Sequence, residues 1–207
     1  MVVFPSKEWV KAVLEAAKQN KNKEAAKGWH GDFLCTVEGD EELLRELNKK
    51  EIVEGFMSLM DIMPPEARKK YKDAPTGKTL ESLGIPLDAP IIELNTDEVL
   101  NKASKLSADE IRDVRMHIWA DFRDGVLREL MPVAPGEHED AIFNLSGNYS
   151  TWKLMASGRQ DVIKLRITGK LKLKVALKRE VALSYVMLRM KPVVTLVTEV
   201  FAKVPVN

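Results

Sequence analysis

The residues of this chain whose types suit catalysis or metal binding are few and scattered. His30, Asp32 and Cys35 lie close together in the sequence, a spacing that could hold a metal ion or activate a thiol. However, Phe33, Cys35 and Val37 alternate with their neighbours in the manner of a strand that buries one face. The Cys35 side chain is then on the buried face, and we expect an unreactive thiol.

No catalytic motif stands elsewhere in the chain. The sequence has no phosphate-binding loop, dinucleotide fingerprint or serine nucleophile elbow. Because Cys35 is the only cysteine, neither an internal disulfide nor a multi-cysteine metal site can form, which suits a reducing, cytoplasmic location. We therefore expect a protein that is not an enzyme and needs no cofactor.

Positive charge is concentrated in the C-terminal quarter. Residues 151–207 contain twelve Lys and Arg against three acidic residues, a net charge of about +9, whereas the whole chain carries +1. Within 169–178, lysines alternate with leucine and valine, which predicts a strand with one apolar and one cationic face. The cationic face is formed by Lys170, Lys172, Lys174 and Lys178.

Two interpretations of these four lysines are compatible with each other. Charges on a solvated strand face prevent edge-to-edge association of sheets. A cationic ridge also docks on anionic lipid headgroups, which predicts peripheral membrane contact. Aromatic residues do not interleave with the lysines, so we do not expect nucleic-acid binding.

The segment 181–201 is apolar at nearly every helical position, and such a helix must be enclosed by protein, lipid or a ligand. A transmembrane helix is not expected, because Arg189 and Lys191 would lie mid-span at a cost of about 2.5–3.5 kcal/mol each. Nor do we expect a signal peptide, since Pro5 and the charged Lys7 and Glu8 follow the short apolar start.

Hydrophobic period and capping residues predict the order of the elements. The expected helices are 6–19, 41–63, short pieces near 65–72, 78–83 and 97–105 (the last capped by Thr96), 148–157, 161–167 and the C-terminal segment. Residues 111–122 fit either a helix or a strand, and the tight-turn dipeptide Asp124-Gly125 favours a hairpin. The expected strands are 32–38, the two arms of this hairpin, 140–146 and 170–177.

The order of motifs after residue 140 resembles a known family. Strand 140–146 is followed by Tyr149-Ser-Thr-Trp152, Gly158, Asp161, Gly169-Lys-Leu-Lys-Leu173 and the apolar C-terminal helix. This pattern is similar to the sterol carrier protein (SCP-2-like) lipid-binding domain over roughly 113–203, with 6–19 and 32–38 as further matching elements. The chain departs from the family at Val175, where a glycine is common.

The resemblance implies an α+β fold with a five-stranded, largely antiparallel sheet. Helices would pack on one face of the sheet around an apolar tunnel that holds an acyl chain, a sterol or another lipid. Residues 1–207 would form a single domain of this type, and 41–106 would be a helical insertion or a lid within it.

Methionines and large apolar residues are the candidates for the tunnel wall, because methionine side chains adapt their shape to a guest. For each residue taken singly, plain core packing is the alternative. The candidates are Phe56, Met57, Met60, Met63, Phe143, Trp152, Leu165, Tyr185, Leu188, Met190, Val197 and Phe201.

The function expected from these observations is non-enzymatic binding or transfer of a lipid, such as an acyl chain, a sterol or an isoprenoid-like molecule. The first alternative is a dimerisation or interaction module that uses the same scaffold without carrying lipid, which would give a homodimer. An enzyme acting on acyl or isoprenoid substrates is a third interpretation.

Overall fold

The computed structural model describes residues 2–91, 94–176, 190–204 and 206, without the side chains of 21–23 and 190. Its centre is one curved sheet with the strand order β3-β2-β1-β4-β5. The strands are β1 Gly31–Glu38, β2 Arg115–Arg123, β3 Val126–Val133, β4 Phe143–Asn148 and β5 Leu171–Val175. Only the β1–β4 pairing is parallel among them, so the predicted α+β class with a five-stranded, largely antiparallel sheet is confirmed.

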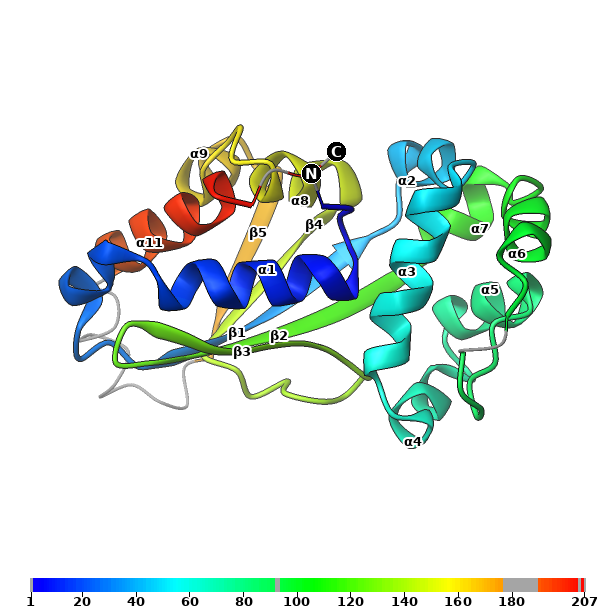
Figure 1. Cartoon of the computed structure of the whole chain (residues 1–207), viewed down its shortest axis with the longest axis horizontal. Coiled ribbons are helices and arrows are strands. Elements are labelled where there is room, and N and C mark those ends of the chain that lie inside the picture. The colour runs from blue at the N-terminus through cyan, green and yellow to red at the C-terminus, as the bar shows by residue number, and fades with distance from the viewer. Residues whose placement is uncertain (1, 92–93, 177–189, 205, 207) are drawn as a thin grey trace.

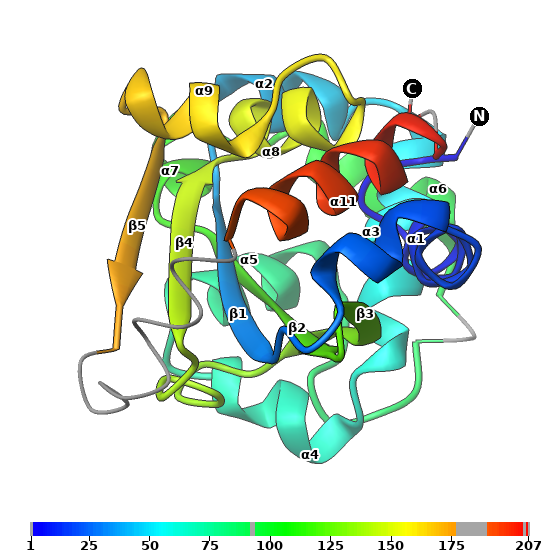
Figure 2. The ribbon, with the colours of Figure 1, turned by 90° about the vertical axis from the view of Figure 1, so that its left-hand side faces the viewer.

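Four helices cover one face of the sheet (Figures 1 and 2). They are α1 Lys7–Lys18, α8 Tyr149–Ala156, α9 Val162–Ile167 and α11 Met190–Ala202. A short 3₁₀ segment, η1 Lys21–Ala26, leads from α1 into β1. Strand alternation turns Phe33 and Cys35 of β1, with Ile118 and Ala120 of β2, toward these helices, and the main core lies between the two layers.

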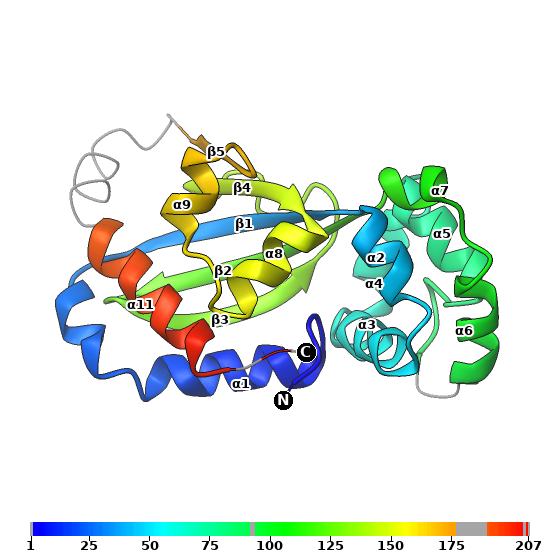
Figure 3. The same ribbon diagram turned by 90° about the horizontal axis from the view of Figure 1, so that it is seen from above.

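The remaining helices form a block at one end of the sheet, between the end of β1 and the start of β2 (Figure 3). They are α2 Glu41–Glu46, α3 Lys50–Ile62, α4 Pro65–Arg68, η2 Lys69–Tyr71, α5 Pro75–Leu83, α6 Thr96–Ala103 and α7 Ala108–Arg112. Ser107 and Glu110 form the predicted capping box at the start of α7.

The prediction of one helix over 41–63 is wrong, because α2 and α3 are separate helices. The side-chain amide of Asn48 donates to the carbonyl oxygens of Leu44 and Arg45, in the last turn of α2. These side-chain hydrogen bonds take the place of further helical bonds, so the helix ends there. Lys49 then adopts an extended backbone before α3 begins. The prediction that Thr96 caps α6 is also wrong, since the Asn95 side chain accepts from the backbone N–H of Asp97.

Two strand boundaries differ from their predictions. The strand predicted at 140–146 is Phe143–Asn148. The Asp32 carboxylate accepts from the backbone N–H of Ile142, and this bond keeps the turn before Phe143 out of the hydrogen-bonded sheet. The strand predicted at 170–177 is described as Leu171–Val175, and residue 177 lies outside the described residues.

The β2–β3 turn needs glycine at its second position. Asp124 and Gly125 have positive φ of 54° and 71°. The Asp124 carboxylate accepts from the backbone N–H of Gly28 at 2.6 Å, and the Gly125 N–H donates to the Trp29 carbonyl at 2.9 Å. A Cβ added at Gly125 would lie 2.4 Å from the carbonyl oxygen of Ala26. The turn is therefore locked against η1 by close backbone contact.

We expect Gly125→Ala to lower the free energy of unfolding by about 2–3 kcal/mol, through left-handed strain and the clash with Ala26. Urea unfolding followed by circular dichroism measures it. The control is Gly136→Ala, which has φ of 84° but no atom within 4 Å of the added Cβ, and should lose about 1 kcal/mol. Equal losses in both variants would show that the contact with Ala26 is unimportant.

A buried polar cluster joins the helical block to the helices over the sheet. Glu46 of α2 is 6% exposed, and its carboxylate accepts from the Tyr149 hydroxyl at 2.7 Å and from the Lys153 ammonium. Asp40 accepts from the backbone N–H groups of Leu43 and Ser150, so one carboxylate caps α2 and contacts the start of α8. These bonds fix the position of α2 relative to α8.

Candidate functional site

The core between the sheet and its covering helices contains a cavity of about 100 Å³. Among the residues that the structure describes, every side chain on its wall is apolar. The wall is formed by Phe4, Trp9, Val13, Ala17, Phe33, Cys35, Val37, Ile118, Ala120, Phe122, Leu127, Leu130, Leu145, Trp152, Met155, Ala156, Val162, Val193, Val194, Leu196, Val197, Val200 and Phe201. A cavity with such a wall favours apolar ligands over water molecules.

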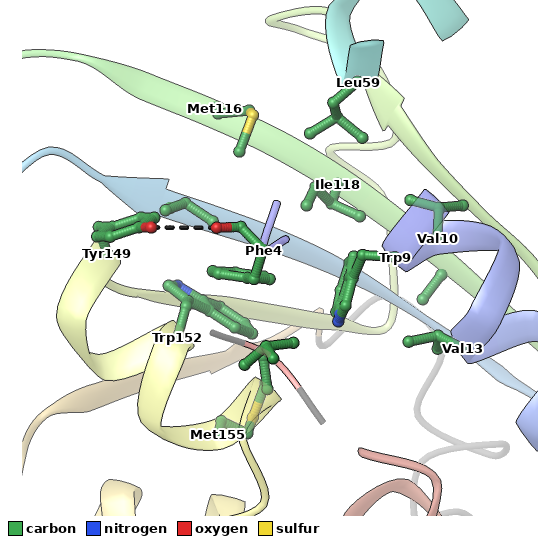
Figure 4. Close-up of a cluster of buried hydrophobic side chains, with 14 of the residues drawn as sticks. Phe4, Trp9, Val10, Val13, Leu59, Met116, Ile118, Tyr149, Trp152 and Met155 are labelled. Atoms are coloured by element: carbon green, nitrogen blue, oxygen red, sulfur yellow. Dashed lines mark hydrogen bonds between the residues drawn. The ribbon is translucent and has the colours of Figure 1, made fainter. Parts of the chain in front are cut away.

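Small side chains on elements that surround the cavity leave its volume unfilled. Ala17 of α1, Ala120 of β2 and Ala156 of α8 all lie on the wall. Aromatic side chains pack around it, among them Phe4, which precedes α1, and Trp152 of α8 (Figure 4). Three alanines from distant parts of the sequence therefore lie on the wall of the same cavity.

Helix α11 forms one whole side of the cavity. Val193, Leu196 and Val200 are almost fully buried against it. The helix approaches the end of α8 closely, because a Cβ added at Gly158 would lie 3.0 Å from Cα of Ala202. Phe201 stacks on Trp9 of α1 with ring centroids 5.9 Å apart. These contacts are all apolar, so α11 is held without hydrogen bonds from its cavity side in the described part of the chain.

The polar groups of two residues on the cavity wall, Trp152 and Cys35, are already engaged or chemically inert. The Trp152 indole N–H donates to the carbonyl of Thr36 at 2.9 Å. The Cys35 thiol faces the cavity, and burial raises its pKa to about 12, so it remains protonated and unreactive. No group of three metal-ligating side chains occurs among the described residues.

The predicted wall residues are distributed over three places. Trp152, Val197 and Phe201 line this cavity. Phe56 and Met60 line a second apolar cavity of about 70 Å³ inside the helical block. The side chains that are buried in the core and line neither cavity are Met57, Met63, Phe143 and Leu165. The positions of Tyr185 and Leu188, and the side chain of Met190, lie outside the described residues.

Sequence reasoning missed the N-terminal part of the wall. Trp9, Val13 and Ala17 recur at helical spacing, which identified them as the buried face of a helix. Nothing in that spacing tells whether such a face meets solid core or a cavity. Phe4 likewise lines the cavity because its ring packs against Trp9, at a centroid distance of 4.9 Å.

The predicted cationic ridge lies at the edge strand, with Lys172 and Lys174 on β5 and Lys170 directly before it. Lys170, Lys172 and Lys174 are exposed, and among the described residues none of the three forms an ion pair. Lys178 lies outside the described residues. Ile163 and Ile167 of α9, the helix that precedes β5, are 48% and 78% exposed, the most exposed large apolar side chains that the structure describes.

The outer side of α11 borders a surface groove of about 480 Å³ between α9 and α11. Ile163 and Ile167 line this groove together with Lys164 and Lys191. Val194 lines both the groove and the internal cavity, so α11 is a wall one helix thick between them. Within the described ranges, no helix combines the length and the apolar character that crossing a membrane requires.

Comparison with solved structures decides the fold. The whole chain superposes on the solution structure of a conserved hypothetical protein from Thermus thermophilus, described as a candidate sterol carrier protein, with a TM-score of 0.53 and 14% identity over 93% of that chain. The chain of 207 residues therefore has the SCP-2-like fold. The crystal structure of sterol carrier protein 2 aligns with 94% of this chain and 97% of its own, at 15% identity and a TM-score of 0.47.

No protein-family model and no curated protein matches the sequence. At 14% identity the structural similarity establishes the SCP-2-like fold, but it does not establish the chemistry of the proteins that share this fold. The predicted resemblance is therefore confirmed as a fold, in which the apolar cavity lies between the sheet and the helices over it.

Proposed function

We propose that this protein binds a lipid-like molecule without catalysing a reaction, in the cavity between the sheet and α1, α8 and α11. The observation that carries the proposal is the cavity wall, which is apolar at every described position although it lies in the middle of the fold. The SCP-2-like fold supports it, since the aligned Thermus thermophilus protein is described as a candidate sterol carrier protein.

The free cavity is smaller than a lipid chain. An apolar cavity of about 150 Å³ accommodates benzene, so 100 Å³ must widen before it accepts an acyl chain. Each buried methylene contributes about 0.8 kcal/mol of binding free energy, so a chain of about twelve carbons gains on the order of 10 kcal/mol. Part of this gain offsets the cost of ordering the acyl chain and of widening the cavity. Outward movement of α11 is the simplest widening, because its contacts with α1 and α8 are apolar.

The groove on the other side of α11 supports contact with a membrane surface. Exposed Ile163 and Ile167 would insert among the lipid headgroups, and the ridge Lys170, Lys172 and Lys174 would neutralise anionic lipids. A lipid in that surface would then be separated from the cavity by α11 alone. The lysines also protect the edge strand β5, and one row of charges serves both purposes.

We expect the triple change of Lys170, Lys172 and Lys174 to Gln to weaken binding to phosphatidylserine vesicles by about 100-fold, at roughly 1 kcal/mol for each basic residue. Co-sedimentation at low salt measures it. The matched control changes three exposed lysines of the helical block, Lys69, Lys72 and Lys78, and should bind as the wild type does. Equal weakening in both variants would mean that only net charge matters and that the ridge has no special role.

We also propose that residues 1–207 form a single domain in which 41–106 is an insertion. In support, β1 and β2 pair antiparallel from Gly31–Phe122 to Glu38–Arg115, so the helical block occupies the connection between two adjacent strands. The block contributes no described residue to the cavity wall, which favours an insertion over a lid.

The experiment that tests the function is native mass spectrometry of the purified protein, followed by solvent extraction of whatever it releases. We expect a monomer that carries one apolar guest, and uptake of a fluorescent fatty acyl probe by the delipidated protein. A bare homodimer that takes up no probe would contradict the proposal and would support the alternative of an interaction module on the same scaffold.

A further inference from the structure

The cavity offers no place for the charged end of a lipid. Every described side chain on its wall is apolar, and its free volume is about 100 Å³. An ionised group buried there would lose its hydration and gain no counter-charge, which is among the most unfavourable arrangements in a protein interior. A lipid whose tail fills this cavity must therefore keep a charged head outside it.

The groove between α9 and α11 adjoins the cavity. The two helices lie side by side over the sheet (Figures 2 and 3). The groove has a volume of about 480 Å³, and Val194 of α11 lines both the groove and the cavity. On α9, Val162 lines the cavity and the next residue, Ile163, lines the groove. A hydrocarbon chain that leaves the cavity between Val162 and Val194 would therefore emerge in the groove.

Two cationic side chains line this groove without an ionic partner among the described residues. They are Lys164 of α9 and Lys191 of α11, and both are exposed. Exposed Ile163 and Ile167 line the same groove. Apolar side chains next to cationic ones are what the first carbons and the anionic head of a lipid would contact.

Two carboxylates also line the groove, and neither pairs with these lysines. Asp161 caps α9, and its carboxylate accepts from the backbone N–H of Lys164 at 2.8 Å. Glu199 follows Lys191 on α11 by eight residues, which places it about 12 Å further along the helix axis. The cationic groups of Lys164 and Lys191 therefore remain available to an anionic ligand.

We propose that the groove is the outer half of the ligand site and holds the head of a single-chain lipid whose head is a carboxylate or a phosphate. The tail passes between Val162 and Val194 into the cavity, and the head lies beside Lys164 and Lys191. This inference rests on the proposed lipid binding, to which it adds the class of lipid and the direction in which it lies.

The first test uses the wild-type protein, with its isoleucine methyl groups labelled for nuclear magnetic resonance, and dodecanoate as the ligand. Ile118 lines the cavity, Ile163 and Ile167 line the groove, and Ile85 of the helical block lines neither. We expect the methyl resonances of Ile118, Ile163 and Ile167 to shift together in one titration. The Ile85 resonance is the internal control and should stay in place.

Each other pattern of shifts has its own meaning. A shift of Ile118 without Ile163 and Ile167 would leave lipid binding intact and show that the head does not lie in the groove. A shift of the groove residues alone would show adsorption at the surface and contradict the inference. Shifts of Ile163 and Ile167 that depend on protein concentration without lipid would show that a second copy of the chain occupies the groove. If dodecanoate and dodecanol both leave Ile118 unmoved, the proposed function fails too.

The second test removes the two cations in the double variant Lys164→Gln and Lys191→Gln. Calorimetric titration below the micelle concentration should show about tenfold weaker binding of dodecanoate and dodecyl phosphate, since each exposed charge pair contributes modestly. Binding of dodecanol should be unchanged. The matched control is Lys11→Gln with Lys18→Gln, which removes two exposed lysines of α1 that line neither space and should bind all three as the wild type does. Equal weakening in both double variants, or a wild type that prefers dodecanol, would contradict the assignment of the head to this groove.

Discussion

Ala120→Leu is expected to reduce uptake of an acyl-chain probe at least tenfold. Ala120 is 7% exposed, lies on β2 in the interior of the sheet, and points into the cavity of about 100 Å³. A leucine there would occupy the space that the guest needs, and the paired strands β1 and β3 leave its backbone no room to retreat. Titration of the delipidated protein with a fluorescent fatty acyl probe measures the loss.

The matched control fills the other cavity. Ala103 of α6 is 1% exposed and lines the cavity of about 70 Å³ in the helical block. Ala103→Leu should leave probe uptake unchanged, while both variants change the free energy of unfolding by no more than about 1–3 kcal/mol through overpacking. If Ala103→Leu abolishes uptake and Ala120→Leu does not, the ligand belongs in the helical block and the proposed site is wrong.

The second large effect concerns stability. We expect Glu46→Ala to lower the free energy of unfolding by about 3 kcal/mol, because it leaves the Tyr149 hydroxyl and the half-enclosed Lys153 ammonium without their common acceptor. Glu42→Ala is the control, since its carboxylate lies 3.7 Å from the same ammonium but is 35% exposed, and it should cost under about 1 kcal/mol. Equal losses would show that burial of the Glu46 carboxylate is unimportant.

The same carboxylate predicts a pH dependence. Burial by itself raises the pKa of Glu46, but the hydrogen bonds from Lys153 and Tyr149 outweigh burial and lower the pKa below its usual 4.5. The folded state therefore binds the proton more weakly than the unfolded state. The contribution of Glu46 to stability is complete above pH 4.5 and is lost as the pH falls through the lowered value.

Chemical denaturation at a series of pH values below 6 checks this expectation. The wild type should lose stability on acidification more steeply than Glu46→Gln, which keeps an acceptor for the Tyr149 hydroxyl and cannot titrate. Parallel curves for the two proteins would contradict the assignment of this pH dependence to Glu46.

Local sequence signals predicted much of the fold. The Ser6 cap and the spacing of Trp9, Val13 and Ala17 defined α1, and alternation in Phe33, Cys35 and Val37 defined β1. The dipeptide Asp124-Gly125 identified the hairpin, since its positive φ angles suit few other residues. Each of these features depends on residues that are close together in the sequence, so it can be predicted from a single sequence.

The candidate site was predicted only in part. Trp152, Val197 and Phe201 were named for their apolar character and do line the cavity. Phe56 and Met60 had the same character, yet they line the separate cavity of the helical block. Apolar composition predicts that a side chain is buried, but it does not tell in which layer of the core.

By itself, the sequence determined the type and order of most elements, the buried face of each and the cationic row on β5. Only the tertiary structure decided that Ala17, Ala120 and Ala156 line one cavity and that α11 closes it. A cavity is a sum of small volumes contributed by residues that are distant in the sequence. It exists only once α1, β2, α8 and α11 are packed together.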